Sequence, residues 1–391
     1  MDATPDPMIR LEGVGKRYED GTVAVHELDL DVPEGELVVL VGPSGCGKST
    51  TLKMVNRLIE PTSGRILLDG DDVTHTDPVA LRRRMGYVIQ QTGLFPHQSV
   101  ATNVATVPRL LGWDKKRIQA RTMELLDLVG LEPDRFAKRY PHQLSGGQRQ
   151  RVGVARALAA DPPVLLMDEP FGAVDPIVRD RLQAEFVRLQ REVRKTVLFV
   201  THDLDEAVRM GDRIAVFRDG GHLEQYDAPP RILGNPATDF VRQFVGSDRG
   251  LKRLSVTAVD VADLDHPPVV HLHDRVADAR RSLDAAGARW GVVLDDDDNL
   301  HGWVAADETG DGSVADRARR MEAWVPLGTS LKAAFSEMLQ HDAGWVAVLD
   351  GDRYLGVLTP ATLHEALRRS VESDLKGVAP DDVDLETVPS A

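Results

Sequence analysis

The sequence has a single cysteine, Cys46, and no apolar run approaches the length of a membrane-spanning helix. One cysteine excludes an internal disulfide. A helix that crosses a bilayer needs about 18–20 consecutive apolar residues. Residues 1–7 also have neither the basic nor the apolar segment of a signal peptide. We therefore expect the protein to stay in the cytoplasm.

Basic charge is scarce, and it is scarcest in the last third of the chain. The formal net charge is -15, and residues 251–391 supply 14 Lys and Arg against 26 Asp and Glu. Nucleic-acid binding depends on basic patches that contact phosphates. The one basic run before that region, residues 82–84, is typical of a solvated face. We expect no nucleic-acid partner.

The remaining composition is that of an ordinary globular protein. The chain has 391 residues, of which 42% are hydrophobic and 28% charged. This length predicts two or three domains, with ample chain for a large core.

Residues 42–50 read GPSGCGKST and follow the apolar segment 37–41. A buried strand, a glycine-rich turn and a Lys-Ser-Thr helix start form the phosphate-binding P-loop in its required context. The glycines allow backbone N–H groups to turn toward a phosphate, and the positive end of the following helix favours the same anion. Lys48 would reach the β- and γ-phosphates, Ser49 would bind Mg²⁺, and Thr50 would bond the α-phosphate. Cys46 lies inside this turn, where we favour a packing role over a redox switch.

Residues 8–41 alternate in short apolar and polar runs separated by turn residues, which predicts antiparallel strands. Tyr18 precedes the first turn. It is either a partly buried strand residue or an aromatic platform for an adenine ring, and spacing alone favours the first.

A long helical pattern covers about residues 100–160 and contains LSGGQ at 144–148. A serine and two glycines directly before a helix make a second anion site by the same dipole argument. Two phosphate-type helix starts in one domain require an explanation.

Polar side chains follow two further apolar strands, at residues 164–167 and 197–200. Asp168 and Glu169 follow the first, and His202 follows the second. We expect Asp168 to bind Mg²⁺ through water and Glu169 to orient or deprotonate an attacking water. These strand ends converge where a doubly wound sheet binds its ligand.

Together these motifs resemble the ATP-binding subunit of ABC transporters across about residues 8–245. Gln90 falls at the Q-loop, residues 173–175 at the D-loop and His202 at the switch histidine. LSGGQ is the decisive motif, because other P-loop ATPases lack it. The resemblance also puts Tyr18 at the adenine-stacking position. We therefore expect Tyr18 to stack on adenine, although spacing alone favours a partly buried strand residue.

The resemblance implies an α/β fold: a RecA-like P-loop NTPase core, an antiparallel β subdomain and an inserted helical subdomain at about 91–160. It also implies that two copies bind head to tail, with Ser145 and Gly147 of one copy capping the γ-phosphate on Lys48 of the other. ATP and Mg²⁺ are the implied ligands. Residues 90–98 would meet transmembrane permease subunits at the cytoplasmic face of the membrane, and a separate solute-binding protein would deliver the solute.

The catalytic residues implied are Glu169, His202 and Gln90, and the Mg²⁺ ligands are Ser49, Gln90 and Asp168. The residues implied in nucleotide binding are Tyr18, Gly42, Pro43, Ser44, Gly45, Cys46, Gly47, Lys48, Ser49, Thr50, Ser145, Gly146, Gly147, Gln148 and Asp175.

A repeat appears beyond Gly246. Residues 288–295 parallel residues 343–350 at a period of 55, and a helical segment precedes each, at 276–286 and 331–340. Two such units indicate a small paired module rather than a solenoid. The module resembles an α+β tandem of CBS domains at 251–370, divided into about 251–310 and 313–370. Residues 371–391 read as an acidic, disordered tail.

The CBS match has one departure. Nucleotide-binding CBS pairs place Ser or Thr, then Asp three residues later, after the second strand. Here the second repeat has Thr359 and Thr362, and the first has Ala305 and Glu308. The missing carboxylate lowers the expectation of an adenine nucleotide. Residues 295–298 form an acidic run in a turn, where a solvated loop is favoured over a metal site.

An ATPase with a C-terminal CBS pair resembles the importer branch for quaternary amines such as glycine betaine, choline, carnitine and proline. Residues 87–97 also look like that branch. This chain would then energise osmoprotectant uptake, and its tail would regulate transport. The alternatives are an importer ATPase for another solute, such as an amino acid or a sugar, and a soluble ABC protein without a transport role.

Overall fold

The computed structural model of the protein describes residues 7–89, 93–172, 176–308 and 312–375. Contacts divide the chain into two compact units. Unit 1 comprises residues 1–232 and 236–246, and unit 2 comprises residues 233–235 and 247–391. Helices α10 (Pro229–Gly234) and α11 (Asp239–Val245) lie where the two ranges interleave. Each unit has hydrophobic clusters of its own.

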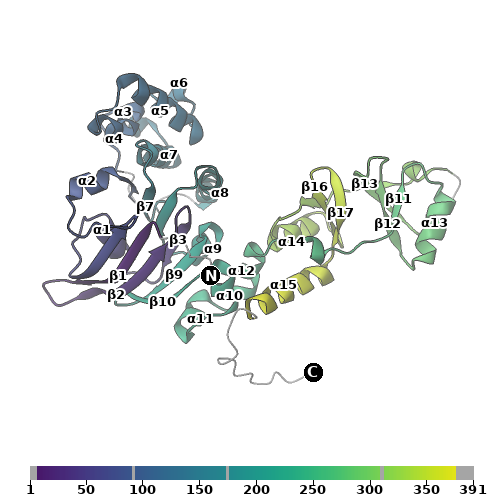
Figure 1. The fold of residues 1–391 in the computed structure, drawn as a ribbon. Coiled ribbons are helices and arrows are strands. Elements are labelled where there is room, and N and C mark those ends of the chain that lie inside the picture. The colour runs from purple at the N-terminus through teal and green to yellow at the C-terminus, as the bar shows by residue number, and fades with distance from the viewer. Residues whose placement is uncertain (1–6, 90–92, 173–175, 309–311, 376–391) are drawn as a thin grey trace. The chain divides into compact units, whose positions relative to one another are not determined.

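Unit 1 contains two sheets (Figure 1). The first is antiparallel, in the order β2-β1-β4-β5. Its alternating burial follows from one face packing on the core and the other facing solvent. The predicted antiparallel strands within residues 8–41 are thereby confirmed for β1 and β2. The strands are β1 (Ile9–Arg17), β2 (Val23–Val32), β4 (Ser63–Leu68) and β5 (Asp71–Asp72).

The second sheet has the order β10-β9-β3-β8-β7-β6, and only its edge strand β10 runs antiparallel to its neighbour. Strands β3 and β8 are buried at every position, as expected of a parallel sheet covered on both faces. The strands are β3 (Leu37–Val41), β6 (Met85–Val88), β7 (Val164–Asp168), β8 (Thr196–Val200), β9 (Arg213–Arg218) and β10 (His222–Asp227).

Helices α1 (Lys48–Val55), α2 (Pro78–Arg83), α8 (Pro176–Val193) and α9 (Leu204–Met210) connect the strands of unit 1. Between β6 and β7 the chain forms a helical subdomain, which Figure 1 shows at one end of the unit. The long helical pattern predicted for residues 100–160 is confirmed, although loops and turns interrupt it. Its helices are α3 (Val100–Val104), α4 (Thr106–Leu110), α5 (Lys115–Leu128), α6 (Pro133–Phe136), the short η1 (Pro141–Gln143) and α7 (Gly146–Leu158).

Unit 2 repeats one arrangement twice. In each copy a short strand pairs in parallel with the first strand of a hairpin. The pairs are β11 (Val269–His271) with β12 (Trp290–Leu294), and β15 (Trp324–Pro326) with β16 (Val346–Asp350). The pair Val269 and Val292 recurs as Trp324 and Ala347, so the register repeats with the same period of 55 as the sequence. The side chains of Trp290 and Trp345, which occupy equivalent repeat positions, stack with ring centroids 4.2 Å apart.

The expected helices of both repeats are confirmed as α13 (Val276–Ala285) and α14 (Leu331–Gln340). Helix α15 continues to Leu375, beyond the boundary at residue 370 that the sequence suggested, and residues 376–391 lie outside the described residues. The remaining elements are α12 (Arg249–Val256), η2 (Val261–Asp263), β11 (Val269–His271), β12 (Trp290–Leu294), β13 (Leu300–Ala305), η3 (Val314–Asp316), β14 (Arg319–Arg320), β15 (Trp324–Pro326), β16 (Val346–Asp350), β17 (Arg353–Leu358) and α15 (Pro360–Leu375).

None of the helices in the described part of the chain combines the length and the apolar character that crossing a bilayer requires.

Candidate active site

The glycine-rich turn after β3 depends on two glycines for its shape. Gly42 has φ +154°, and a Cβ there would lie 2.3 Å from the Phe217 carbonyl oxygen. Gly47 has φ +99°, and a Cβ there would lie 2.3 Å from the Ala24 carbonyl oxygen. Any other residue would collide with the backbone at either position. The turn leads directly into α1, whose first residue is Lys48.

Lys48 is buried inside this turn. Its Nζ donates hydrogen bonds to the carbonyl oxygens of Gly42, at 2.8 Å, and Pro43, at 2.7 Å. Its Nζ also lies 3.5 Å from the Cys46 sulfur. Burial raises the pKa of the Cys46 thiol, although the charge of Lys48 opposes that effect. A thiol that resists ionisation is a poor nucleophile, which supports a packing role for Cys46.

The helix start and the end of β7 meet through Ser49 and Asp168. The Ser49 hydroxyl donates to Asp168 Oδ1 at 2.7 Å. Two hard oxygen atoms in contact fit a Mg²⁺ ion, which takes one or two protein ligands and completes its octahedron with phosphate and water. Within the described residues no group of three or more His, Cys, Asp or Glu side chains is placed to hold a metal. Any Mg²⁺ here would therefore depend on a nucleotide for its other ligands.

Glu169 and His202 lie close together at the ends of β7 and β8. His202 Nδ1 is 3.4 Å from Glu169 Oε2. The backbone N–H of Glu169 donates to the Val200 carbonyl oxygen at 3.0 Å, and Glu169 has φ +44°. This left-handed conformation is unusual for a residue other than glycine and is found at functional turns. The expected convergence of the strand ends is therefore present for this acid and this imidazole.

The start of α7, where the sequence predicts a second anion site, has the predicted helix-start geometry. Ser145 caps α7: its hydroxyl accepts the Gln148 N–H at 3.3 Å, and Gln148 Oε1 accepts the Ser145 N–H at 3.0 Å. This reciprocal pair is a capping box. Ser145 and Gly146 are exposed to solvent. A helix N-terminus that is capped, exposed and glycine-lined is available to an anion outside this copy of the chain.

Some of the other expected site residues lie in the described part of the chain, and two do not. Tyr18 is 40% exposed, and the Lys16 ammonium lies over its ring, 5.4 Å from the centroid. Ser44 and Gly45 are exposed at the tip of the glycine-rich turn, and Thr50 lies in α1. Gln90 and Asp175 lie outside the described residues.

Sequence reasoning missed two groups beside this site. Tyr87 lies on β6, and burial together with the Asp168 charge raises its pKa to about 12. Glu206 is buried on α9, where Gln183 Nε2 donates to it at 2.8 Å. The sequence carried no signal for Glu206, because its burial arises from α8 packing on α9. Tyr87 is adjacent to the Q-loop motif, but nothing in the pattern indicated its proximity to Asp168.

Unit 2 contains a cavity of about 320 Å³ next to Thr359. The Thr359 hydroxyl donates to Asp265 Oδ2 at 3.3 Å. Asp265 comes from the segment before β11, far from Thr359 in the sequence. A carboxylate is therefore present beside Thr359, although it does not come from the position three residues later.

Two family models match the chain. The ABC transporter model matches residues 25–172, which include the glycine-rich turn, the α7 start and the end of β7. The CBS domain model matches residues 318–369, which form the second repeat of unit 2.

Curated relatives match almost the whole length. The osmoprotectant import ATP-binding protein OsmV of Salmonella typhimurium is 46% identical over 360 residues, covering 90% of this chain and 94% of the relative. The glycine betaine/carnitine/choline transport ATP-binding protein OpuCA of Bacillus subtilis is 42% identical over 374 residues, covering 94% and 98%.

Solved structures match more than half of the chain. A dimeric ATP-binding cassette in a post-hydrolysis state, bound to ADP and phosphate, has a TM-score of 0.51 and 36% identity, covering 57% of this chain and 99% of that chain. The CbiO1 component of a Clostridium perfringens ABC transporter complex has a TM-score of 0.55 and 27% identity, covering 64% and 98%.

Proposed function

Because the chain belongs to the family of ABC transporter ATP-binding proteins, we propose that it hydrolyses ATP to drive the import of quaternary-amine osmoprotectants. One observation carries the ATPase part: a P-loop whose Ser49 contacts Asp168 occurs in the same chain as Glu169 beside His202 and the capped start of α7. The relatives named for osmoprotectant, glycine betaine, carnitine and choline transport support the class of solute.

Each group has a distinct role in this proposal. The backbone N–H groups of residues 44–48 bind the phosphates, and Lys48 exchanges its two carbonyl partners for phosphate oxygens. Tyr18 stacks on the adenine. Glu169 accepts a proton from the attacking water, and His202 holds that carboxylate and the γ-phosphate in position. Ser49, Asp168 and Gln90 would hold a Mg²⁺ ion, which would supply positive charge to balance the charge that develops on the phosphates.

The site is completed by a second copy of the chain. Ser145 and Gly147 of one copy would cap the γ-phosphate bound at Lys48 of the other, with Asp175 near the shared boundary. This explains why the α7 start is exposed and capped although the nucleotide binds elsewhere in its own chain. The dimeric ATP-binding cassette that matches 57% of this chain supports such an arrangement.

Transport requires partners outside this chain. We propose that residues 90–98 contact transmembrane permease subunits, that the chain works at the cytoplasmic face of the membrane, and that a separate solute-binding protein supplies the solute. ATP-driven closure and hydrolysis-driven opening of the dimer would then move the permease subunits. We further propose that unit 2 is a tandem CBS module that regulates this cycle.

Replacing Glu169 tests the ATPase assignment. We expect Glu169→Gln to bind ATP and dimerise but to hydrolyse ATP at least ~100-fold more slowly, because a general base contributes roughly 10²–10⁴-fold. Phosphate release measures hydrolysis, and the size of the protein with and without ATP measures dimerisation. Both are measured on the chain alone and on the chain assembled with its permease subunits.

Glu124→Gln on α5 is the matched control, since Glu124 is an exposed carboxylate paired with Arg121. It should leave both measurements unchanged. Wild-type turnover by Glu169→Gln in the assembled transporter would show that another group is the base.

A further inference from the structure

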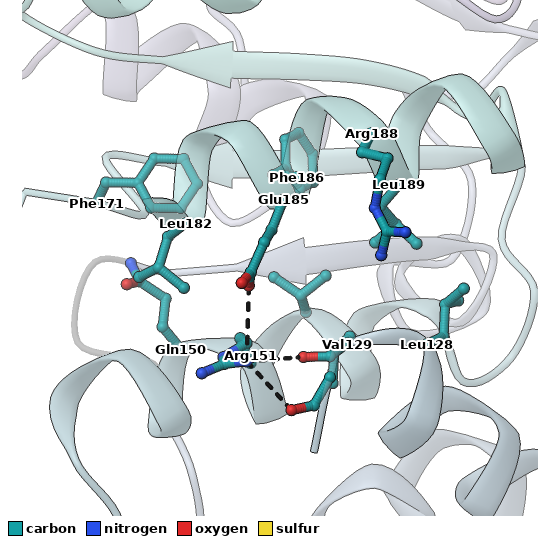
Figure 2. A pocket seen from close by; sticks show the side chains of 12 residues that line it. Leu128, Val129, Gln150, Arg151, Phe171, Leu182, Glu185, Phe186, Arg188 and Leu189 are labelled. Carbon is teal, nitrogen blue, oxygen red and sulfur yellow. Dashed lines mark hydrogen bonds and ion pairs between the residues drawn. The ribbon is translucent and has the colours of Figure 1, made fainter. Parts of the chain in front are cut away.

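A cavity of about 290 Å³ lies between the helical subdomain and α8 (Figure 2). Its walls come from the end of α5, the middle of α7, Phe171 after β7, and α8. The volume is close to the lower end of the ~300–1,000 Å³ typical of small-molecule sites. No residue assigned above to ATP lines it. The cavity is therefore separate from the nucleotide site, although one wall is the helix that the LSGGQ motif begins.

Most of the wall is apolar. The lining includes Val154 on α7 and Leu182 and Phe186 on α8. Figure 2 shows the Phe171 side chain at one end. These four side chains are buried, so they are held in place by the surrounding core. Such a lining excludes small, strongly hydrated ions and favours an apolar body.

Among the described residues, two buried side-chain atoms in the wall make no hydrogen bond: Gln150 Oε1, an acceptor, and Arg151 Nε, a donor. The Gln150 side chain is 3% exposed, and its Oε1 accepts no hydrogen bond from any described residue. A buried acceptor without a donor is unfavourable, and such groups are rare in native cores. Because Gln150 lines the cavity, a ligand N–H or O–H can satisfy it there.

The charged groups at the cavity favour an anion. The lining contains two guanidinium groups, Arg151 and Arg188, and one carboxylate, Glu185. Glu185 already pairs with Arg151 at 3.6 Å and with Arg181 at 3.1 Å. The Arg188 guanidinium makes a long contact of 3.9 Å with the exposed Glu192. This guanidinium can therefore turn to an anionic group on a ligand, for which its fixed donor geometry is well suited.

We propose that this cavity binds an amphiphilic small-molecule anion. The ligand has an apolar body among Val154, Phe171 and Leu182, a hydrogen-bond donor at Gln150 Oε1 and one anionic group at Arg188. Because α7 and α8 form opposite walls, an occupant would fix their separation and so influence the LSGGQ end of α7. Binding itself does not depend on the proposed ATPase function and is measured without nucleotide.

The probe is 8-anilinonaphthalene-1-sulfonate, which has an aromatic body, one N–H and one sulfonate. We expect the full-length chain to bind one molecule with enhanced fluorescence. Val154→Trp fills the cavity and should weaken binding more than ~10-fold. Leu182→Phe fills it from the opposite wall with a smaller change in volume, so the result does not depend on one variant folding. Thermal unfolding with and without probe checks each variant, since a bound ligand stabilises the native state.

A second dye tests the charge. N-phenyl-1-naphthylamine has the same rings and N–H but no sulfonate. Arg188→Gln should raise the dissociation constant of the sulfonate dye about two- to fivefold, as expected for an exposed ion pair. It should leave the dissociation constant of the neutral dye unchanged. If Arg188→Gln weakened the binding of both dyes equally, the assignment of the anionic group to Arg188 would be wrong.

Surface binding gives a different pattern. Leu110 is 59% exposed on α4 and does not line the cavity, so Leu110→Ser should leave binding of both dyes unchanged. If both filling variants fold and bind the sulfonate dye as wild type does, or if Leu110→Ser removes the signal, the dye binds at the surface and the proposed site is wrong.

Discussion

Glu206 shows how one buried charge is accommodated behind the candidate active site. Burial raises its pKa, whereas hydrogen bonds from Thr201 and Gln183 act in the opposite direction. Thr201 directly precedes His202, and Gln183 lies on α8, so Glu206 links the strand end that carries His202 to a neighbouring helix. The chain has a carboxylate at this position. An amide would make similar hydrogen bonds there without the cost of burying a charge.

That cost predicts a pH dependence for Glu206→Gln. A raised pKa in the folded state means that the stability Glu206 contributes is fully present below the ordinary carboxyl value of 4.5 and is lost as the pH rises through the folded value. The amide in this variant keeps an acceptor and cannot ionise. The free energy of unfolding of Glu206→Gln, relative to wild type, should therefore increase as the pH rises from about 4.5 to neutral. Urea denaturation across this range measures it.

Asp20→Asn supplies a control of opposite sign. The Thr22 N–H lowers the pKa of exposed Asp20, so its contribution is present above the ordinary carboxyl value and is lost as the pH falls. A difference between Glu206→Gln and wild type that stays constant across the same range would contradict the prediction.

At the scale of elements, the sequence predicted best where the chemistry is local. The turn after β3 needs glycines because Gly42 and Gly47 approach the backbone of other strands, and such positions are visible as a motif. The start of α7 is likewise visible, because a cap and its partner are three residues apart. Both features were predicted from a few adjacent residues.

Elements defined by distant partners were harder to predict. Strands β11 and β15 have three residues each, too few to show an alternating pattern, and exist because each pairs with a buried strand of its own repeat. The repeat indicated two equivalent units but not that Trp290 and Trp345 would stack. Asp265 reaches Thr359 from a segment 94 residues away, which no local motif could show.

The α7 start allows capping to be separated from anion binding. Ser145→Ala removes the cap and should lower the free energy of unfolding by about 1 kcal/mol. It should also remove the proposed contact with the γ-phosphate. Ser145→Asp caps equally well, because a carboxylate accepts the same N–H and favours the positive helix end. We expect Ser145→Asp to keep wild-type stability in urea but to lose ATP-dependent dimerisation, since its charge repels the γ-phosphate.

The comparison of the two Ser145 variants is decisive for this helix end. If Ser145→Asp dimerised with ATP as wild type does, the α7 start would not meet a phosphate. Loss of stability in Ser145→Asp equal to that of Ser145→Ala would instead contradict the capping argument.

At the scale of the whole molecule, charge is divided unequally between the two units. Residues 251–391 carry a net -12 of the total -15. Part of this charge is the exposed loop at residues 295–298 between β12 and β13, where the sequence predicted a solvated turn. Interactions of exposed charges weaken as salt rises, because the screening length falls from ~10 Å at 0.1 M to ~3 Å at 1 M. We therefore expect the electrostatic interactions of unit 2 to depend on ionic strength more than those of unit 1.

Removing unit 2 should consequently remove a salt response while leaving the ATPase intact. We expect solute uptake and ATP hydrolysis by the assembled transporter in vesicles to change with salt for the full-length chain, and to stay nearly constant for a chain ending at Gly246, where unit 1 ends. The double variant Asp296→Asn and Asp297→Asn is a milder test, since it lowers the charge of the exposed loop without truncation and should reduce the response. If the full-length and shortened chains respond to salt alike, unit 2 has no part in sensing ionic strength, and the ATPase assignment still stands on Glu169→Gln.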